Sequence, residues 1–541
     1  MTRLTGNRFA VLTSSCFLPL VVLATVLRGA DKPDVIDVGS RRELFVDRYL
    51  IDRISGDARL QMHHPAPREV VVERDQPCEQ GAYGFGYITV LRDGDRYCMY
   101  YKGGMMREFP DQKKQAFGIA DILICYAESA DGIHWEKPKL GLHEFAGNKD
   151  NNIVWKGLGS HGFTPFIDTR PGCPPEERYK ALGTSKTDIK PLPGGTKYLF
   201  VLKSPDGIHW TQMEGPKNHG AILGQNDGDF DSQNVAFWDE DAECYRLYFR
   251  KRRDVTTRPD LANRADDGEG YRDVKARVRD VKTATSDDCL HWSKPEFLTY
   301  PGAPDEELYT NQILPYPRAP HIYLGFPTRY VEARGALTSW HEKMSQKTPG
   351  RTYTSYTDGL LMSSRDGRTF HRWGEAFLRP RVPERTMWGY GSCYQNYGIV
   401  ETKADEPGAH NELSFYVVEH YRHDNPLIRR HTLRPDGFVS AYAPLSGGQL
   451  VTKPLRVSGN RLTLNMSTSA AGSIRVEIQN QQGEPLDNFS LNDCPPLFGN
   501  TLDRAVKWNT SMPLDSATQQ PIRLRFELRD ADLYSFQFTA S

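Results

Sequence analysis

The sequence predicts an all-β fold in which a five-bladed β-propeller is followed by a C-terminal β-sandwich. Three observations predict it: a turn motif that recurs five times, a pair of strand-like segments ahead of each copy, and a change of pattern beyond residue 440. No stretch of the chain keeps the 3.6-residue apolar period of an amphipathic helix, which disfavours helical and α/β folds. With 541 residues, the chain is long enough for two domains and a short leader.

The recurring turn has the form Ser-x-Asp-Gly-x-His-Trp in its fullest copies. Its copies are centred on five aspartates that lie 70 to 82 residues apart, the last of them in the weakest copy: Asp131, Asp206, Asp288, Asp366 and Asp436. A period of this length corresponds to one supersecondary unit per copy. We interpret the turn as structural, because Ser and Asp side chains can bond turn amides, Gly adopts a positive φ, and the Trp can pack between neighbouring units.

Each unit also carries two strand-like segments ahead of its turn, rich in Tyr, Phe, Val and Ile. The pairs are 87–91 with 96–102, 163–168 with 179–183, 234–238 with 245–250, 312–316 with 321–326, and 397–401 with 413–420. Their polar connections indicate hairpins. A third strand follows in most units, so three strands and the segment around the Trp make a four-stranded antiparallel blade. We therefore assign residues 40–440 to the propeller.

The pattern changes after Ser440 to short strands with alternating apolar residues. They are expected at 461–465, 473–479, 504–508, 522–528 and 533–539. About 100 residues of this kind predict a small β-sandwich over residues 441–541. Residues 444–448 are a plausible connector between the two domains.

The first 30 residues have the layout of a secretory signal: basic residues, an apolar run from Phe9 to Leu27, and then Gly29 and Ala30 before a charged residue. Residues 1–30 are therefore expected to be a signal peptide and the mature protein to be secreted or periplasmic. Polar residues at 13–15 make this run a poor membrane span, and a retained N-terminal anchor is the alternative. No other membrane contact is expected.

The composition excludes some partners. The chain has 68 Lys and Arg against 69 Asp and Glu, a formal net charge of -1, so nothing draws it to nucleic acid. The cysteines beyond the leader are spread singly with no Cys-x-x-Cys pair, which argues against a zinc cluster or a dense disulfide framework and leaves one or two bridges open. We expect no metal and no cofactor, and the oligomeric state is not predicted.

The repeated turn resembles, one residue shorter, the Asp-box turn of sialidases. Together with the strand pair at 86–102 and the terminal sandwich, it resembles the five-bladed propeller glycosidases of families 32 and 43, the invertase and arabinanase types. The resemblance implies cleavage of a carbohydrate substrate by acidic residues around a central funnel. The first-blade Trp-x-Asn-Asp-Pro-Asn-Gly segment of those families is absent, and the closest local likeness is the segment 231–234, ahead of a strand of the third unit.

Strand direction selects the candidate residues, because residues just before the first strand and just after the second strand of a blade share one face. Glycoside cleavage needs one carboxyl group as acid and another as nucleophile or base. We predict Asp231 as base or nucleophile and Glu419 as acid, with Glu79 as a substitute for either and Asp229 as a neighbour that tunes their pKa values. The same face gathers the candidates for substrate binding, which are Tyr83, His161, Arg250, Asn311, Arg329, Tyr390 and Tyr394.

Structural alternatives exist for these residues. Asp229 and Asp231 could cap a surface turn, and Glu419 could pair with Arg422 or Arg250. The basic cluster at 250–253 would suit a carboxylated or sulfated sugar if it faces the funnel, or it could be a solvated strand end. At the level of function, the alternative to a glycoside hydrolase is a non-catalytic carbohydrate-binding or scaffold propeller. Two converging carboxyl groups in a pocket would favour the enzyme.

Overall fold

The computed structural model describes residues 35–80, 85–104, 122–185, 198–255, 277–332, 334–347, 352–381, 389–421, 423 and 425–540. The expected signal peptide and the candidate residue Tyr83 lie outside these ranges. The all-β prediction is confirmed: strands dominate, and the helices of the described chain are the short α1 (Ser339–Lys347) and α2 (Leu514–Ala517). Within the described ranges, no helix has the length and apolar character needed to span a membrane.

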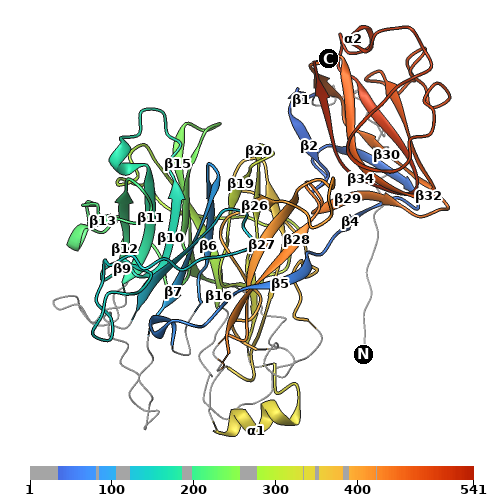
Figure 1. The fold of residues 1–541 in the computed structure, drawn as a ribbon. Coiled ribbons are helices and arrows are strands. Elements are labelled where there is room, and N and C mark those ends of the chain that lie inside the picture. The colour runs from blue at the N-terminus through green and yellow to red at the C-terminus, as the bar shows by residue number, and fades with distance from the viewer. Residues whose placement is uncertain are drawn as a thin grey trace, which may run out of the picture.

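Five antiparallel sheets, here called sheets I to V, each contain one copy of the repeat (Figure 1). Sheets I to IV are meanders in chain order. Sheet I consists of β6 (Thr89–Asp93), β7 (Arg96–Gly103), β8 (Leu123–Ser129) and β9 (Ile153–Lys156), and sheet II of β10 (His161–Ile167), β11 (Tyr179–Ser185), β12 (Tyr198–Ser204) and β13 (Thr211–Gln212). Sheet III consists of β14 (Val235–Asp239), β15 (Cys244–Asp254), β16 (Arg277–Ser286) and β17 (Glu296–Phe297), and sheet IV of β19 (Leu314–Tyr316), β20 (Ala319–Gly325), β23 (Met362–Ser364) and β24 (His371–Arg372). The fourth unit adds a small sheet of β18 (Glu307–Leu308), which precedes β19, and of β21 (Thr328–Val331) and β22 (Tyr356–Gly359), which lie between β20 and β23 in the chain.

Sheet V takes its outermost strand from the N-terminal part of the chain. It contains β25 (Tyr394–Gln395), β26 (Val400–Thr402), β27 (Glu412–Glu419), β28 (Leu427–Leu433) and β5 (Ala66–Glu73). β5 pairs antiparallel with β28, and Figure 1 shows the blue strand beside the orange one. This pairing covers the edge of β28 and ties the start of the repeat region to its end.

The C-terminal region forms one long, hydrogen-bonded sheet that also recruits N-terminal strands. Its members are β2 (Arg42–Leu44), β3 (Ile51–Gly56), β4 (Arg59–Met62), β29 (Val439–Ala443), β30 (Gly448–Thr452), β32 (Arg461–Gln479), β33 (Asn500–Ala505) and β34 (Arg523–Thr539), while β1 (Ile36–Gly39) pairs with β31 (Leu455–Val457). β32 and β34 span 19 and 17 residues, and their mutual register is broken by a bulge between Thr468 and Ser473. The strands β2 to β4 of residues 42–62, which we had assigned to the propeller, therefore belong to this sheet by their pairing.

Strands β6, β10, β14, β19 and β26, one from each of the five sheets, border a single cavity of about 680 Å³. One lining residue from each sheet, in order from I to V, is Val90, Ile167, Trp238, Leu314 and Ile399. An isolated bridge between Thr89 and Tyr397 also joins sheet I directly to sheet V. The first and last copies of the repeat are therefore neighbours in space.

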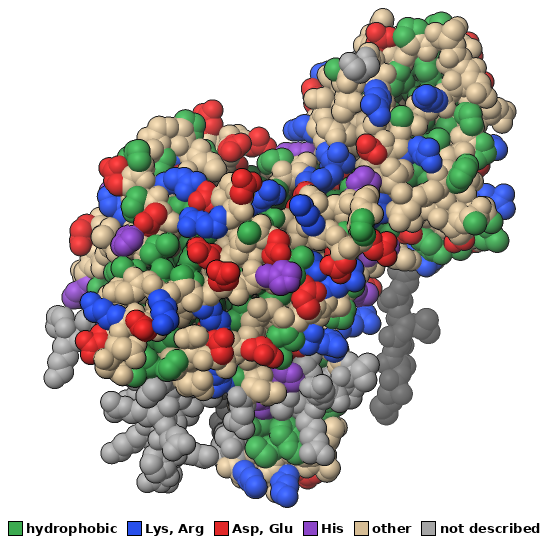
Figure 2. All heavy atoms as spheres, in the orientation of Figure 1, with side chains coloured by type: hydrophobic (Ala, Val, Ile, Leu, Met, Phe, Trp, Pro, Cys, Tyr) green, Lys and Arg blue, Asp and Glu red, His purple; other side chains and the backbone are tan. Residues whose placement is uncertain are grey.

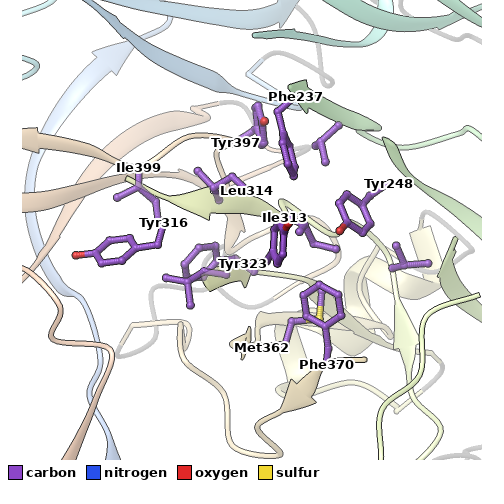
Figure 3. Close-up of a cluster of buried hydrophobic side chains, with 14 of the residues drawn as sticks. Phe237, Tyr248, Ile313, Leu314, Tyr316, Tyr323, Met362, Phe370, Tyr397 and Ile399 are labelled. Carbon is purple, nitrogen blue, oxygen red and sulfur yellow. The ribbon is translucent and has the colours of Figure 1, made fainter. Parts of the chain in front are cut away.

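Most strands of these sheets are buried on both faces: in β7 and β27, every residue after the first is buried. Figure 3 shows part of the largest cluster, in which Phe237 of sheet III stacks against Tyr248 and against Tyr323 of sheet IV, with ring centroids 6.1 and 6.3 Å apart. On the face shown in Figure 2, Lys and Arg side chains are interspersed with Asp and Glu side chains, in keeping with the near-zero formal charge. All eight cysteines of the described chain are free.

The predicted structural role of the repeated turn is confirmed. Asp131 accepts hydrogen bonds from the Ser129 hydroxyl and from the backbone N–H groups of Ile133 and His134, and the other full copies repeat this pattern. The turns also bind the preceding sheet: the Tyr416 hydroxyl of sheet V donates to the Gly132 carbonyl at 2.6 Å. In the same way, Tyr100 binds Gly207 and Tyr248 binds Gly367, both at 2.9 Å.

A side chain is excluded at the turn glycines. Gly207 has a φ of +80°, and a Cβ atom there would lie 2.5 Å from the Tyr100 hydroxyl oxygen. The glycine of the motif is therefore required both by the left-handed backbone and by the tyrosine that packs on it.

The fifth copy of the turn has a different role. Asp436 is fully buried and accepts hydrogen bonds from Tyr316 and Arg318 of sheet IV, and from three residues of the long C-terminal sheet or its edge, Arg42, Asn465 and Ser535. Burial alone would raise the pKa of this carboxyl group, but Arg318 and Arg42 outweigh burial and hold the pKa below its usual value. Asp436 therefore joins the repeat region to the C-terminal sheet.

His431 makes the stability of sheet V dependent on pH. Burial, assisted by the charges of Arg429 and Arg381, lowers its pKa to about 4. The unfolded chain, with a His pKa of about 6.5, binds more protons between these values, so the free energy of unfolding falls as the pH drops from about 6.5 to about 4, by roughly 3 kcal/mol in total. Urea unfolding of the wild type and of His431→Gln at pH 7, 5 and 4 measures this. We expect the wild type to lose stability relative to the variant over that range; a constant difference would contradict the assignment.

Candidate functional site

Six tyrosines form a buried cluster, here called the tyrosine cage. Tyr87 comes from the segment before sheet I, Tyr309 and Tyr330 from the fourth unit, and Tyr390, Tyr394 and Tyr421 from the fifth. Their ring centroids lie 5.6 to 6.5 Å from one another in successive pairs, and each residue is at most 9% exposed. The hydroxyl group of Tyr390 donates to that of Tyr309 at 2.6 Å. The predicted residues Tyr390 and Tyr394 are thus brought together by the fold.

Asp231 lies beside the cage, in the segment that leads into β14. Its carboxylate is 25% exposed, 3.5 Å from the Nε2 atom of His161 and 3.7 Å from the Nη2 atom of Arg250. Burial raises the pKa of Tyr87, and the charges of Tyr309 and Asp231 raise it further, so Asp231 also acts electrostatically on the cage. Three predicted residues, from sheets II and III, therefore meet at one point.

The two partners of Asp231 are themselves held by the cage. Arg250 is 3% exposed, and its guanidinium lies 4.8 Å from the centre of the Tyr309 ring as a cation–π contact. His161 is 4% exposed and meets the ring of Tyr87 edge-on at 5.5 Å. Burial opposes the charge on Arg250, but Tyr309 and Asp231 outweigh it and raise the pKa of the guanidinium. A partly exposed carboxylate is thus set among buried aromatic and cationic groups.

Backbone strain accompanies the cage. Tyr87, Cys393 and His420 have left-handed backbones with φ of +58°, +64° and +56°, although none of them is glycine. Such conformations cost of order 1–3 kcal/mol each and gather at functional sites. They mark the segments that deliver Tyr87, Tyr394 and Tyr421 to the cage.

Asp229 has a structural role. Its Oδ2 atom accepts the backbone N–H of Arg252 at 2.7 Å, and its own N–H donates to the Arg250 carbonyl oxygen at 2.8 Å. These bonds fix the loop before β14 against the end of β15. The alternative that this residue stabilises a turn is supported for Asp229, and its predicted effect on neighbouring pKa values stays a prediction.

Glu79 is enclosed by structural donors. It is fully buried, and its carboxylate accepts bonds from the Tyr101 hydroxyl at 2.6 Å, from Lys137 at 2.9 Å, and from the backbone N–H groups of Asp75 and Gln76 at 3.1 and 3.0 Å. Both oxygens are occupied, which favours a structural role over the predicted catalytic one.

This role can be tested with Glu79→Gln, which replaces one accepting oxygen by an amide that repels the Lys137 ammonium group. We expect the free energy of unfolding to fall by about 3 kcal/mol, since one partner of a buried pair is removed, while substrate turnover by the folded fraction is retained. Urea unfolding and an activity assay on the same preparation measure both quantities. Lost turnover with unchanged stability would restore Glu79 as a catalytic residue.

Glu419 is also paired. It is 3% exposed, and its two oxygens accept bonds from the Nε atom of Arg429 at 3.0 and 2.9 Å, with Arg381 at 3.7 Å. The structural ion pair that we considered is therefore present, but with Arg429; Arg422 lies outside the described residues. Glu419 would have to leave Arg429 to protonate a substrate.

Asn311 and Arg329 form side-chain bonds with residues of the third and fourth units. Asn311 accepts the Ile313 N–H at 3.3 Å and donates to the Tyr248 carbonyl oxygen at 3.5 Å. Arg329 binds Asp358 with two bonds of 3.0 and 2.7 Å and Glu306 with one of 2.9 Å. Their substrate-binding roles remain predictions, because the side-chain bonds of both residues that the structure describes go to groups other than Asp231 and the cage.

A group of bonded glutamines close to the cage was not predicted from the sequence. The Gln312 side-chain amide donates to the Oε1 atom of Gln233 at 2.6 Å and to the Gln395 carbonyl oxygen at 3.0 Å, and Gln233 donates to Thr89 at 3.0 Å. These bonds link sheets III, IV, V and I. The signal was present as neighbouring Gln and Asn residues just before the inner strands, at 233–234, 311–312 and 395–396.

Over the part of the chain that the structure describes, no group of three or more His, Cys, Asp or Glu residues is arranged to hold a metal ion. The side chains that meet beside the cage offer a carboxylate (Asp231), an imidazole (His161), a guanidinium (Arg250) and tyrosine hydroxyl groups. A carboxylate in this setting can accept a proton or attack an electrophilic carbon.

The chain matches no family model, and no curated protein matches it in sequence. Its structure is similar to those of several glycoside hydrolases. A family 32 β-fructofuranosidase of Bombyx mori is 8% identical, with a TM-score of 0.35 over 89% of this chain and 95% of that one. An endo-arabinase of Bacteroides thetaiotaomicron is 10% identical, with a TM-score of 0.35 over 69% of this chain and 98% of that one. A family 117 glycoside hydrolase of Zobellia galactanivorans is 11% identical, with a TM-score of 0.34 over 69% of this chain and 90% of that one.

All three are carbohydrate-cleaving enzymes by their names, and one belongs to family 32, which the sequence resemblance also named. At such identities and TM-scores, they transfer neither an activity nor the role of any residue to this chain. The function must be inferred from the site itself.

Proposed function

We propose that the protein is an exported glycoside hydrolase that cleaves a poly- or oligosaccharide in a funnel at the centre of a five-bladed β-propeller. The observation that carries the proposal is Asp231: a partly exposed carboxylate beside a buried arginine, a buried histidine and a tyrosine cage. Aromatic rings bind the apolar faces of sugars, and a carboxylate supplies a base or nucleophile. The cavity shared by sheets I to V and the Tyr-to-Gly bonds between successive sheets support the propeller.

In the proposed reaction, Asp231 acts as base or nucleophile. His161 is a positioning residue, because its separation of 3.5 Å from Asp231 is shorter than the spacing of about 5 Å or more between the acid and the nucleophile or base of a glycosidase. Arg250 lies 3.7 Å from Asp231 and attracts its carboxylate as an opposite charge. Glu419 stays our proposed acid, and the reaction then requires its pair with Arg429 to open.

The remaining parts of the proposal concern the rest of the chain. We propose that residues 1–30 direct export, that the mature protein is secreted or periplasmic, and that the long C-terminal sheet curls into a β-sandwich. A full gene product expressed with its first 30 residues, then sequenced from its N-terminus, tests the export signal.

A non-catalytic carbohydrate-binding propeller is the second candidate. It is favoured by one observation, namely that Glu79 and Glu419 are buried and paired, which leaves Asp231 and Asp229 as the partly exposed carboxylates among the predicted catalytic residues. This candidate predicts saccharide binding without cleavage.

The deciding experiment is sugar release by the purified chain across neutral, uronic and sulfated polysaccharides, beside binding measurements on the same panel. Cleavage that is lost in Asp231→Asn supports the hydrolase. Binding without cleavage of any member supports the second candidate, and cleavage retained in the variant overturns the site.

A further inference from the structure

Three arginines occupy one face of the β15–β16 hairpin. Arg250 and Arg252 are two residues apart on β15 and therefore point to the same side, and Arg279 of β16 lies directly opposite Arg252 in the register. The guanidinium groups of Arg250 and Arg279 both lie over the Tyr309 ring, at 4.8 and 5.3 Å, which places this face against the tyrosine cage. Like charges directly opposite each other destabilise a sheet. The arrangement therefore carries a cost that folding alone does not explain.

Two of these arginines are neutralised by neighbouring acids. Arg279 forms a buried ion pair with Glu307, whose side chain is 3% exposed. Arg250 lies 3.7 Å from Asp231. Both guanidinium groups are thus matched by a carboxylate within the site.

Arg252 has the longest ion pair and the most exposed side chain of the three arginines. Its side chain is 40% exposed, its nearest carboxylate oxygen, on Asp229, is 3.9 Å away, and its guanidinium makes no hydrogen bond to any residue of the described ranges. The Asp229 carboxylate is already used by the backbone N–H of Arg252. Partial burial lowers the pKa of Arg252, and the charges of Arg279 and Arg250 lower it further, as expected for a cation in a positive field.

We propose that Arg252 binds the carboxylate or sulfate group of an acidic saccharide, so that the substrate class of the site is an anionic glycan. An anion at this position would relieve the repulsion among the three arginines and accept a forked pair of hydrogen bonds from the guanidinium. Residues two apart on a strand are separated by about 6.6 Å, so a sugar whose acidic group meets Arg252 reaches Arg250 and the neighbouring Asp231. The inference rests on the proposed function in placing the sugar there.

The test compares acidic saccharides with matched neutral ones. The probes are a galacturonate oligosaccharide and its carboxyl-reduced form, and a sulfated galactan oligosaccharide and its desulfated form, each titrated calorimetrically into the full chain. We expect the wild type to prefer one acidic probe over its neutral partner, and Arg252→Gln to reduce that preference about tenfold or more, since a charge-assisted bond is removed. Arg252→Lys should keep part of it. The preference should also weaken at high salt.

Lys251 provides the matched control. It precedes Arg252, points to the opposite face of the hairpin, and donates to the carbonyl oxygens of Gln225 and Asn226. Lys251→Gln removes one positive charge from the same strand and should leave the preference unchanged. An equal loss in both variants would reduce the effect to net charge and overturn the inference.

The outcomes separate this inference from the proposed function. Equal affinity for the acidic and neutral member of each pair, no binding of either acidic probe, or an unchanged preference in Arg252→Gln overturns the inference. If the protein cleaves neutral glycans only, the inference is overturned, but the proposed hydrolase function is kept. Preferential binding of an acidic probe without cleavage keeps the inference and moves the function to a binding module. The two acidic probes distinguish a carboxylate from a sulfate ligand.

Discussion

Replacing Asp231 with Asn is expected to lower the kcat of saccharide cleavage by about 10² to 10⁴-fold, the usual contribution of a positioned acid or base. The amide has the same shape as the carboxylate but cannot take a proton or form a glycosyl ester. Because Asp231 is 25% exposed and lies in a loop, the fold should tolerate the change. Initial rates on a saccharide that the wild type cleaves, with folding checked by circular dichroism, measure the effect.

The matched control for this experiment is Asp227→Asn in the same loop. Asp227 accepts the backbone N–H of Gly224 at 3.0 Å and was not predicted to act on the substrate. We expect its kcat to stay within about threefold of the wild type. A loss as large in Asp227→Asn would show that the loop, rather than the Asp231 carboxylate, matters; retained activity in Asp231→Asn would remove Asp231 from the reaction.

The repeat made the sheets predictable, because its signals are local. A turn such as that at Asp131 closes on its own Ser129 and on amides two and three residues ahead, so its structure can be inferred from seven consecutive residues. Asp436 belongs to the same motif but binds Tyr316, Arg318 and residues of the C-terminal sheet instead. The fifth copy lacks the Ser and the His-Trp of the fuller copies, but the partners of Asp436 are set by what packs against the turn and cannot be inferred from these residues.

The N-terminal strands show the same limit. β5 pairs with β28, and β1 to β4 pair with C-terminal strands, although hundreds of residues separate the partners. These strands carry no copy of the repeat and no short turn that would fix a partner. Their pairing depends on the closure of the whole chain, which a reading of local patterns does not contain.

Strand direction was sufficient to bring part of the site together. His161, Asp231 and Arg250 meet because each lies at the same end of an inner hairpin, which the repeat defines. Strand direction did not indicate which of the acidic residues face solvent. Glu79 lies in the 3-10 helix Pro77–Glu79 ahead of β6, and Glu419 is the last residue of β27. Lys137 and Arg429 occupy their carboxylates, and the repeat does not define the directions of these two cationic side chains.

Removal of the Asp436 carboxylate should have the largest effect on stability. In Asp436→Ala, the guanidinium groups of Arg42 and Arg318 lose a fully buried partner, and the Tyr316 and Ser535 hydroxyls lose their acceptor. We expect the free energy of unfolding to fall by about 3 to 5 kcal/mol, as for other broken buried ion pairs. Because these partners belong to sheet IV and to the long C-terminal sheet, the variant should also be cleaved more readily by protease between the two regions.

The comparison variant is Asp288→Ala, in a full copy of the same turn. Asp288 is 48% exposed and binds its own turn, so its loss should cost no more than about 1 kcal/mol after allowance for solvent screening. Urea unfolding at pH 7 measures both variants. Equal losses would mean that the fifth turn acts only as a local cap, and that the contacts of Asp436 with Arg42 and Arg318 do not hold the two regions together.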